Sequence, residues 1–105
     1  MKRKIKFTPT ADGQLTAIEN TPSKAALLGQ VRKAIGHLEI DPHHPGLQTH
    51  EFGSLIGVNG EKVFEAYAQN NTPGAYRIFG HYGPDEIKGK MRTPVITIVA
   101  ITPHP

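Results

Sequence analysis

The sequence predicts an α+β protein, in which a short N-terminal strand and a helical hairpin pack on a mostly antiparallel β-sheet meander. Two observations support this class. Apolar residues recur at helical spacing in the first 40 residues, whereas later segments alternate polar and apolar residues or form β-branched runs. Short Gly, Pro and Asn connections separate these later runs. We therefore expect the helices to cover one face of the sheet and the other face to stay open.

The N-terminal elements have recognisable start signals. Residues 3–7 alternate polar and apolar side chains, as in a short edge strand. Thr8-Pro9 then predicts a helix N-cap with proline at the first helical position, although Gly13 weakens this helix. Its apolar residues at helical spacing are Ala11, Leu15 and Ile18.

The second helix has a wider apolar stripe. Thr21-Pro22 repeats the start signal, and the helix must end before Asp41-Pro42, because proline disfavours helical geometry in the preceding residue. The stripe consists of Leu27, Leu28, Val31, Ala34, Ile35 and Leu38.

Four strands are predicted after the helices, in residues 49–55, 62–69, 75–82 and 95–102. Residues 59–60 and 72–74 have turn composition, and residues 83–94 read as a longer loop. These spacings predict neighbouring antiparallel strands with short connections.

The amino-acid composition excludes several kinds of site and several protein classes. A chain of 105 residues fits one domain, residues 1–105, and the lack of cysteine excludes disulfides, thiol nucleophiles and cysteine-bound zinc. No apolar signal core or membrane span is present, so we expect a soluble cytoplasmic protein with no membrane contact. The six histidines match no metal-binding spacing, and His43-His44 lies in a proline-flanked loop, so no metal or cofactor is expected.

Basic residues gather near both ends of the chain. Twelve Lys and Arg against nine Asp and Glu give a net charge of +3, which slightly favours polyanionic partners. The alternative is that these are only solvated basic ends. The predicted RNA-binding residues are Lys2, Arg3, Lys4, Lys62, Lys88, Lys90 and Arg92.

Three segments resemble the RelE/ParE superfamily of bacterial toxins. "DPHHPGLQTHEF" is similar to the way this superfamily closes its helical hairpin with Asp-Pro and a Gly-Leu-rich lead into the sheet. "AYRIFGHYG" resembles its Tyr-Arg strand, and "ITIVAITPHP" resembles its final strand, which commonly ends near a histidine. The element order is similar over nearly the whole chain.

This resemblance implies a toxin that cleaves mRNA on the ribosome and is neutralised by a cognate antitoxin. Arg77 matches the strand arginine that contacts the scissile phosphate, and His104 matches a terminal histidine used as an acid in the YoeB-like branch. Pro105 stands where that branch has tyrosine, and Gly46-Leu47 stands where it has a glutamate base. The superfamily also contains gyrase-poisoning members without the nuclease residues.

Metal-free RNA cleavage requires a base, a cation at the phosphate and an acid for the leaving oxygen. Arg77 and His104 supply two of these, and Glu65 or His81 is the candidate for the third. With a loop at residues 71–75, Gln69 opposes Arg77 and Glu65 opposes His81, whereas a slip of one residue moves Glu65 to the other face. The shared face would hold Glu65, Tyr67, Arg77, Phe79 and His81.

Simpler interpretations exist for the same residues. Arg77 and Glu65 can form an exposed cross-strand ion pair. His50 can be an exposed strand residue, and His104 can be part of a frayed end between Pro103 and Pro105. The aromatic side chains can be sheet packing. The competing functions are therefore an endoribonuclease toxin, a non-enzymatic module that is gyrase-directed or only binds an antitoxin, and an unrelated small RNA-binding domain.

Overall fold

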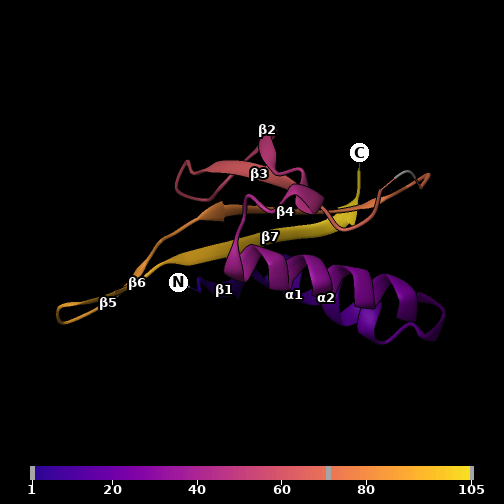
Figure 1. The fold of residues 1–105 in the computed structure, drawn as a ribbon, viewed down its shortest axis with the longest axis horizontal. Helices are drawn as coiled ribbons and strands as arrows, with labels where there is room; N and C mark the ends of the chain where they lie inside the picture. The colour runs from indigo at the N-terminus through magenta and orange to yellow at the C-terminus, as the bar shows by residue number, and fades with distance from the viewer. Residues whose placement is uncertain (1, 71, 105) are drawn as a thin grey trace.

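The computed structural model describes residues 2–70 and 72–104, so Asn71 and Pro105 of the predicted loop and tail lie outside the described residues. A five-stranded sheet forms the centre, with helices along one side (Figure 1). The elements in chain order are β1 (Lys4–Phe7), α1 (Pro9–Glu19), the 3₁₀ turn η1 (Pro22–Lys24), α2 (Ala25–Ile40), the 3₁₀ turn η2 (Pro45–Leu47), β2 (His50–Ile56), β3 (Lys62–Tyr67), β4 (Tyr76–Tyr82), β5 (Glu86–Lys88), β6 (Met91–Thr93) and β7 (Val95–Pro103).

The sheet has the strand order β1-β7-β4-β3-β2. Strands β2, β3, β4 and β7 are antiparallel neighbours, which confirms the predicted meander. Strand β1 lies at the edge and pairs in parallel with β7, so that Lys4 lies beside Val95 and Phe7 beside Ile98. The predicted α+β class is therefore confirmed, and the last strand lies inside the sheet rather than at its edge.

The two helices begin in different ways. At α1 the Thr8 Oγ1 accepts a hydrogen bond from the Ala11 N–H at 3.2 Å, as the N-cap prediction requires. Thr21 is not a cap. Its hydroxyl donates to the Ala17 carbonyl at 2.7 Å, and a 3₁₀ turn delays the start of α2 until Ala25. Helix α2 ends at Ile40, before Asp41, as predicted.

The main core lies between the helices and the sheet. The predicted stripe of α2 supplies four of its buried side chains, while Leu28 and Ile35 are half-buried at its border. The sheet contributes alternate residues of β3, one residue of β4 and three residues of β7, in which the step from Ile98 to Ile101 spans a register shift in the pairing with β4. The buried core members are Ala11, Ile18, Leu27, Val31, Ala34, Leu38, Leu47, Phe64, Ala66, Ile78, Ile96, Ile98 and Ile101.

Gly80 marks a place where β4, β3 and β7 approach closely. A Cβ there would lie 2.9 Å from the Thr97 carbonyl oxygen and 3.1 Å from Phe64 Cζ. We expect Gly80→Ala to lower the free energy of unfolding by about 1–3 kcal/mol, because the neighbouring strand backbone must move. Urea denaturation measures this change. Gly36→Ala is the control, since α2 is open around that glycine and alanine favours helix there.

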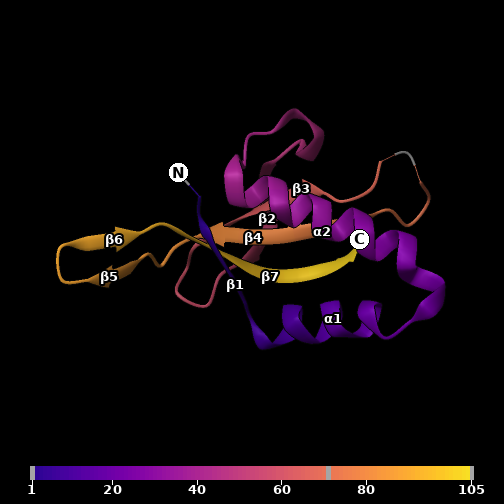
Figure 2. The same ribbon diagram turned by 60° about the horizontal axis from the view of Figure 1, so that its bottom comes forward.

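Residues 83–94 are not only a loop. They contain a separate β5–β6 hairpin, in which Lys88 pairs with Met91 across a turn at Gly89, whose φ is 58°. The hairpin extends away from the helices and the central sheet (Figure 2). Its strands have three residues each and little apolar alternation, so the sequence pattern did not reveal them.

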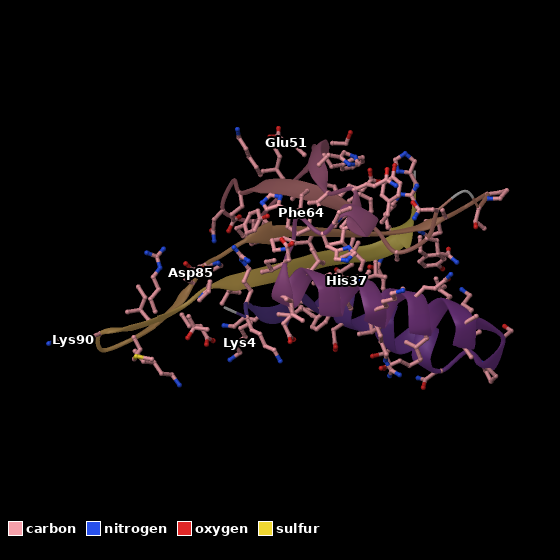
Figure 3. All side chains as sticks on the ribbon, in the orientation of Figure 1. Lys4, His37, Glu51, Phe64, Asp85 and Lys90 are labelled. Carbon is pink, nitrogen blue, oxygen red and sulfur yellow. The ribbon has the colours of Figure 1, made fainter. Side chains whose placement is uncertain are left out.

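The acidic residues of this hairpin are paired at its base. Glu86 lies 3.2 Å from Lys4 Nζ and 2.6 Å from Lys6 Nζ, and Asp85 lies 3.0 Å from Arg92 Nε. Figure 3 shows Asp85 near the base of the hairpin and Lys90 at its tip. The charged contacts therefore join the hairpin to β1, while its tip is cationic.

Acidification is expected to loosen the hairpin base. Hydrogen bonds from Lys6 and Lys4 lower the pKa of Glu86. A carboxyl with a lowered pKa in the folded state stabilises the fold at neutral pH and loses this contribution as pH falls through the folded value. At pH values below about 4, hydrogen-exchange protection in residues 86–93 should therefore decrease before protection in β4 does. Glu86→Gln should abolish this difference, and uniform loss of protection in the wild type would contradict it.

Candidate active site

Polar side chains from two neighbouring strands gather on the sheet face opposite the helices. In the observed pairing Glu65 lies beside Phe79, and Tyr67 lies beside Arg77. Because alternate residues of a strand share a face, His81 lies on this face too. The predicted grouping of these five residues is confirmed.

The register within that face differs from the prediction. Arg77 pairs with Tyr67 rather than with Gln69, a shift of two residues that leaves the face unchanged. The backbone N–H groups of Ala68 and Gln69 both donate to the Tyr76 carbonyl, each at 3.2 Å. This local irregularity, which the loop composition does not reveal, changes which residues stand opposite each other.

The face is covered around its centre, contrary to the expectation of an open sheet. Glu65 is 1% exposed and Arg77 is 9% exposed, so an exposed cross-strand ion pair is ruled out. Phe52 of β2 packs on Phe79 with ring centroids 4.9 Å apart. The end of β7 turns toward this side (Figure 1) and brings His104 over the sheet, with its ring 6.4 Å from that of Phe52.

Three basic side chains surround the Glu65 carboxylate. His104 Nδ1 lies 2.5 Å from Oε2, and His50 Nε2 lies 2.8 Å from Oε1. Arg77 Nε lies 3.8 Å from Oε2, beyond hydrogen-bond distance. We name these four residues the Glu65 cluster. They come from β2, β3, β4 and the segment after β7, so the fold assembles the cluster from distant parts of the sequence.

Hydrogen bonds restrict the protonation of His50. Its Nδ1 lies 2.7 Å from the Gln48 carbonyl oxygen, and a carbonyl only accepts, so Nδ1 carries a proton. The contact between Nε2 and the Glu65 carboxylate then needs a further proton between these atoms.

His104 is oriented by the same carboxylate. The Nδ1–H group donates to Glu65, which directs the opposite ring nitrogen, Nε2, away from the carboxylate. The His104 side chain is 48% exposed, whereas Glu65 is buried. A buried carboxylate that fixes an imidazole and stabilises its charged form is the arrangement that prepares histidine for proton transfer.

Arg77 is fixed in position, and among the described residues its buried Nε has no hydrogen-bond partner. Its Nη1 donates to the Gln69 carbonyl at 2.7 Å, and its guanidinium stacks on the Tyr67 ring, with Cζ 3.6 Å from the centroid. A buried N–H without a partner is costly, which makes this group a candidate donor for a ligand oxygen.

The charge balance of the Glu65 cluster favours an anion. One carboxylate faces a permanent guanidinium and two imidazoles that can be charged. Among the described residues, no group of three or more His, Asp or Glu side chains is arranged to hold a metal ion. The cluster can therefore bind an oxyanion at Arg77 and exchange protons at His104.

His81 is not part of the cluster. It is buried, with Nδ1 3.2 Å from the Tyr82 carbonyl oxygen and Nε2 4.0 Å from Glu61 Oε2. The backbone N–H groups of Glu61 itself and of Asn59 lower the pKa of the Glu61 carboxyl, and the charge of His81 adds to this effect. Of the four predicted catalytic residues, the structure brings together Glu65, Arg77 and His104.

Most of the predicted RNA-binding residues lie around β1 and the hairpin, away from the Glu65 cluster, whereas Lys62 lies three residues before Glu65 on β3. Lys2 pairs with Glu39 at 3.6 Å and Lys62 with Glu51 at 3.9 Å. Strand β7 runs nine residues from the hairpin to His104, which corresponds to about 30 Å. Their RNA-binding role stays a prediction. The other members of the set are Arg3, Lys4, Lys88, Lys90 and Arg92.

The sequence interpretation missed the contacts of two side chains. His50 is an exposed strand residue, as expected, and it also stands directly opposite Glu65 in the β2–β3 pairing. Tyr67 was assigned to sheet packing, whereas it also supports the guanidinium of Arg77. Only the register of β2 against β3 could have placed His50 opposite Glu65. The sequence does not predict this register, because the pairing is irregular between Glu51 and Ile56.

Comparison with known proteins identifies the architecture. No protein-family model and no curated protein matches the sequence. A solved structure, a YoeB/ParE toxin from Agrobacterium tumefaciens, superimposes with a TM-score of 0.64 over 97% of this chain and 99% of the toxin. The fold is that of a YoeB/ParE toxin.

The YoeB/ParE fold confirms the resemblance to the RelE/ParE superfamily at the level of architecture. Because the sequence identity is 10%, the match shows the fold but assigns no role to any residue of this chain. The function of the Glu65 cluster must therefore be argued from its own geometry. No helix in the described part of the chain is long and apolar enough to cross a membrane.

Proposed function

We propose that the protein is the toxin of a toxin–antitoxin pair and that the Glu65 cluster cleaves mRNA on the ribosome, in the cytoplasm, without a metal. The observation that carries this proposal is the buried Arg77 Nε, which has no partner in the described part of the chain, beside a histidine that a buried carboxylate orients. An oxyanion donor next to a proton-transfer group is what phosphodiester cleavage needs. The YoeB/ParE fold supports the toxin assignment and a cognate antitoxin as partner.

In this proposal the 2′-hydroxyl of RNA attacks the adjacent phosphorus, and the 5′-oxygen of the next nucleotide leaves. Arg77 Nε donates to a non-bridging oxygen and stabilises the charge that builds up there. Charged His104 gives a proton to the leaving oxygen from Nε2. Glu65 keeps its hydrogen bond to His104 Nδ1, a remaining lone pair of the carboxylate accepts the hydroxyl proton, and His50 at Oε1 balances the change of charge.

Inducible expression in a bacterium, with growth followed and mRNA ends mapped, tests the proposal. Codon-phased cuts in the wild type that are absent with Arg77→Lys support it. Growth arrest with intact messages contradicts it and favours a gyrase-directed module. Growth without arrest also contradicts it, and leaves an antitoxin-binding protein or a small RNA-binding domain.

A further inference from the structure

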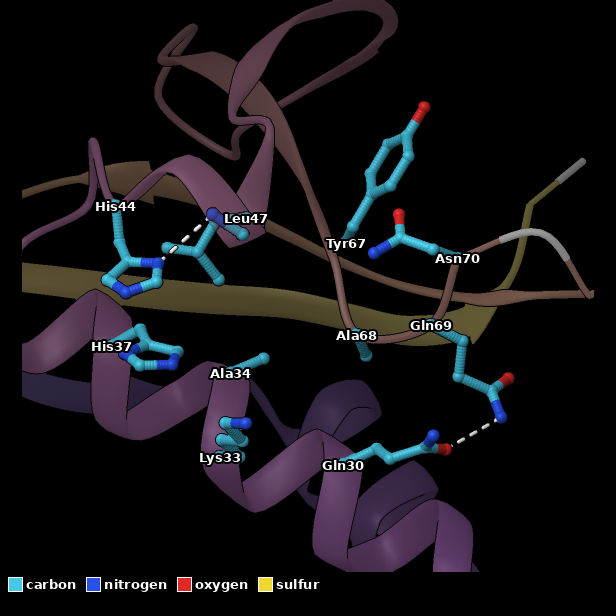
Figure 4. Close-up of a pocket in the computed structure, with 11 residues that line it drawn as sticks. Gln30, Lys33, Ala34, His37, His44, Leu47, Tyr67, Ala68, Gln69 and Asn70 are labelled. Atoms are coloured by element: carbon cyan, nitrogen blue, oxygen red, sulfur yellow. Dashed lines mark hydrogen bonds between the residues drawn. The ribbon is translucent and has the colours of Figure 1, made fainter.

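A pocket of about 410 Å³ lies between α2, the η2 turn and the end of β3 (Figure 4). Its apolar surface comes from three small or medium side chains, those of Ala34, Leu47 and Ala68. Ala34 and Leu47 are buried core residues, so this surface is rigid. Polar side chains form the rest of the wall. This size is within the range of small-molecule sites.

The polar wall of the pocket is basic or neutral. Lys33 lines it, together with His37 and His44, and no Asp or Glu is among its described lining residues. The rings of His37 and His44 stack at 3.8 Å. Partial burial lowers the pKa of His37, and the charges of His44 and Lys33 lower it further. Lys33 is therefore the main cation of the pocket, which favours an anionic ligand.

Amide side chains stand at the other end of the pocket. Gln69 Nε2 donates to Gln30 Oε1 at 2.9 Å, and the Gln69 Oε1 accepts from the Tyr76 N–H at 3.0 Å. These bonds hold the Gln69 side chain at both ends. Asn70 also lines the pocket, and its Oδ1 accepts from Gln48 at 3.3 Å. Amides beside an apolar surface suit a flat ring with hydrogen-bonding edges.

The pocket shares a wall with the Glu65 cluster. Tyr67 lines the pocket, and its ring stacks on the Arg77 guanidinium at 3.6 Å. Figure 4 shows Tyr67 and Asn70 on the strand side of the pocket, with the Tyr67 ring pointing away from α2. An RNA molecule with one phosphate at Arg77 can thus place a neighbouring nucleotide in the pocket.

We propose that the pocket between α2 and β3 binds one nucleotide of the RNA, next to the phosphate held by Arg77. Lys33 pairs with the phosphate of this nucleotide, and its base lies on Ala34, Leu47 and Ala68, with the amides at its edge. This inference rests on the proposed RNA cleavage for its biological meaning. Binding of a mononucleotide can be measured without cleavage.

The test uses the full chain, and cleavage does not interfere because a nucleoside 5′-monophosphate has no internucleotide bond to cut. Adenosine, guanosine, cytidine and uridine 5′-monophosphates are titrated while backbone amide signals are followed by NMR. At least one should shift the amides of Ala34, Leu47 and Ala68. Lys33→Glu should weaken this binding about tenfold or more, whereas Arg32→Glu, at an exposed α2 residue that pairs with Glu19 and does not line the pocket, should not change it.

Each other outcome overturns the inference. Equal binding of inorganic phosphate alone means a simple anion site, and shifts that avoid the pocket place the ligand elsewhere. Unchanged affinity with Lys33→Glu removes the phosphate contact, and shifts caused by an acidic peptide but by no nucleotide assign the pocket to a protein partner. If nucleotide binds here but the wild type cuts no mRNA, the pocket stands and the proposed function falls. If mRNA is cut but no nucleotide binds here, the proposed function stands and the inference about the pocket falls.

Discussion

Arg77→Lys is expected to reduce RNA cleavage by about 100-fold or more, because lysine keeps the charge but cannot place a donor at the Nε position. In the wild type that donor is fixed by the Gln69 carbonyl and the Tyr67 ring. The cleavage rate of ribosome-bound mRNA by purified protein measures the effect. Circular dichroism and thermal unfolding show whether the fold is kept.

Arg32→Lys is the matched control for this prediction. Arg32 is exposed on α2, where its partner is Glu19. The exchange there should leave the cleavage rate within about twofold of the wild type. Cleavage by Arg77→Lys at the wild-type rate would contradict the phosphate role of the guanidinium.

His104→Ala should lower the cleavage rate by a factor of about 100 to 10,000, the usual contribution of a positioned acid or base. The change removes both the proton donor and the hydrogen bond to Glu65. His104→Asn separates these two roles, because the asparagine amide can still donate to the carboxylate but cannot transfer a proton. We expect both variants to be equally slow in single-turnover cleavage assays.

A different result for the two variants has a clear meaning. If His104→Asn cuts at the wild-type rate while His104→Ala does not, His104 only orders the Glu65 cluster. The acid must then be sought elsewhere, with His50 as the nearest histidine on the same carboxylate. Thermal unfolding of both variants controls for loss of structure.

Local patterns predicted the elements that depend on local chemistry. The Thr8 cap, the end of α2 before Asp41 and the alternation in β3 and β4 were all readable, because each depends on neighbouring residues. The β5–β6 hairpin was not readable, since its short polar strands lack a period. Local periodicity therefore placed Glu65 and Arg77 on one face of the sheet, but it did not reveal the β5–β6 hairpin.

The burial of the Glu65 cluster could not be predicted in the same way. It depends on Phe52 packing over Phe79 and on His104 turning across the sheet, which are contacts between distant segments. A glutamate side chain with 1% exposure contradicts ordinary residue preferences, and its three basic neighbours offset the cost of burying it. The sequence therefore identified three members of the cluster but missed His50 and the enclosure.

The parallel pairing of β1 with β7 limits the order in which the chain can fold. Lys4 and Phe7 have their partners at Val95 and Ile98, and α1 receives a contact from the same strand, where the Ile101 N–H donates to Gln14 at 2.7 Å. During synthesis, the first strand and the apolar side of the helical hairpin must wait until β7 has emerged. Such long-range pairing slows folding and prolongs the exposure of apolar surface. The nascent protein is thus open to chaperones, proteases or a partner until its last strand is inserted.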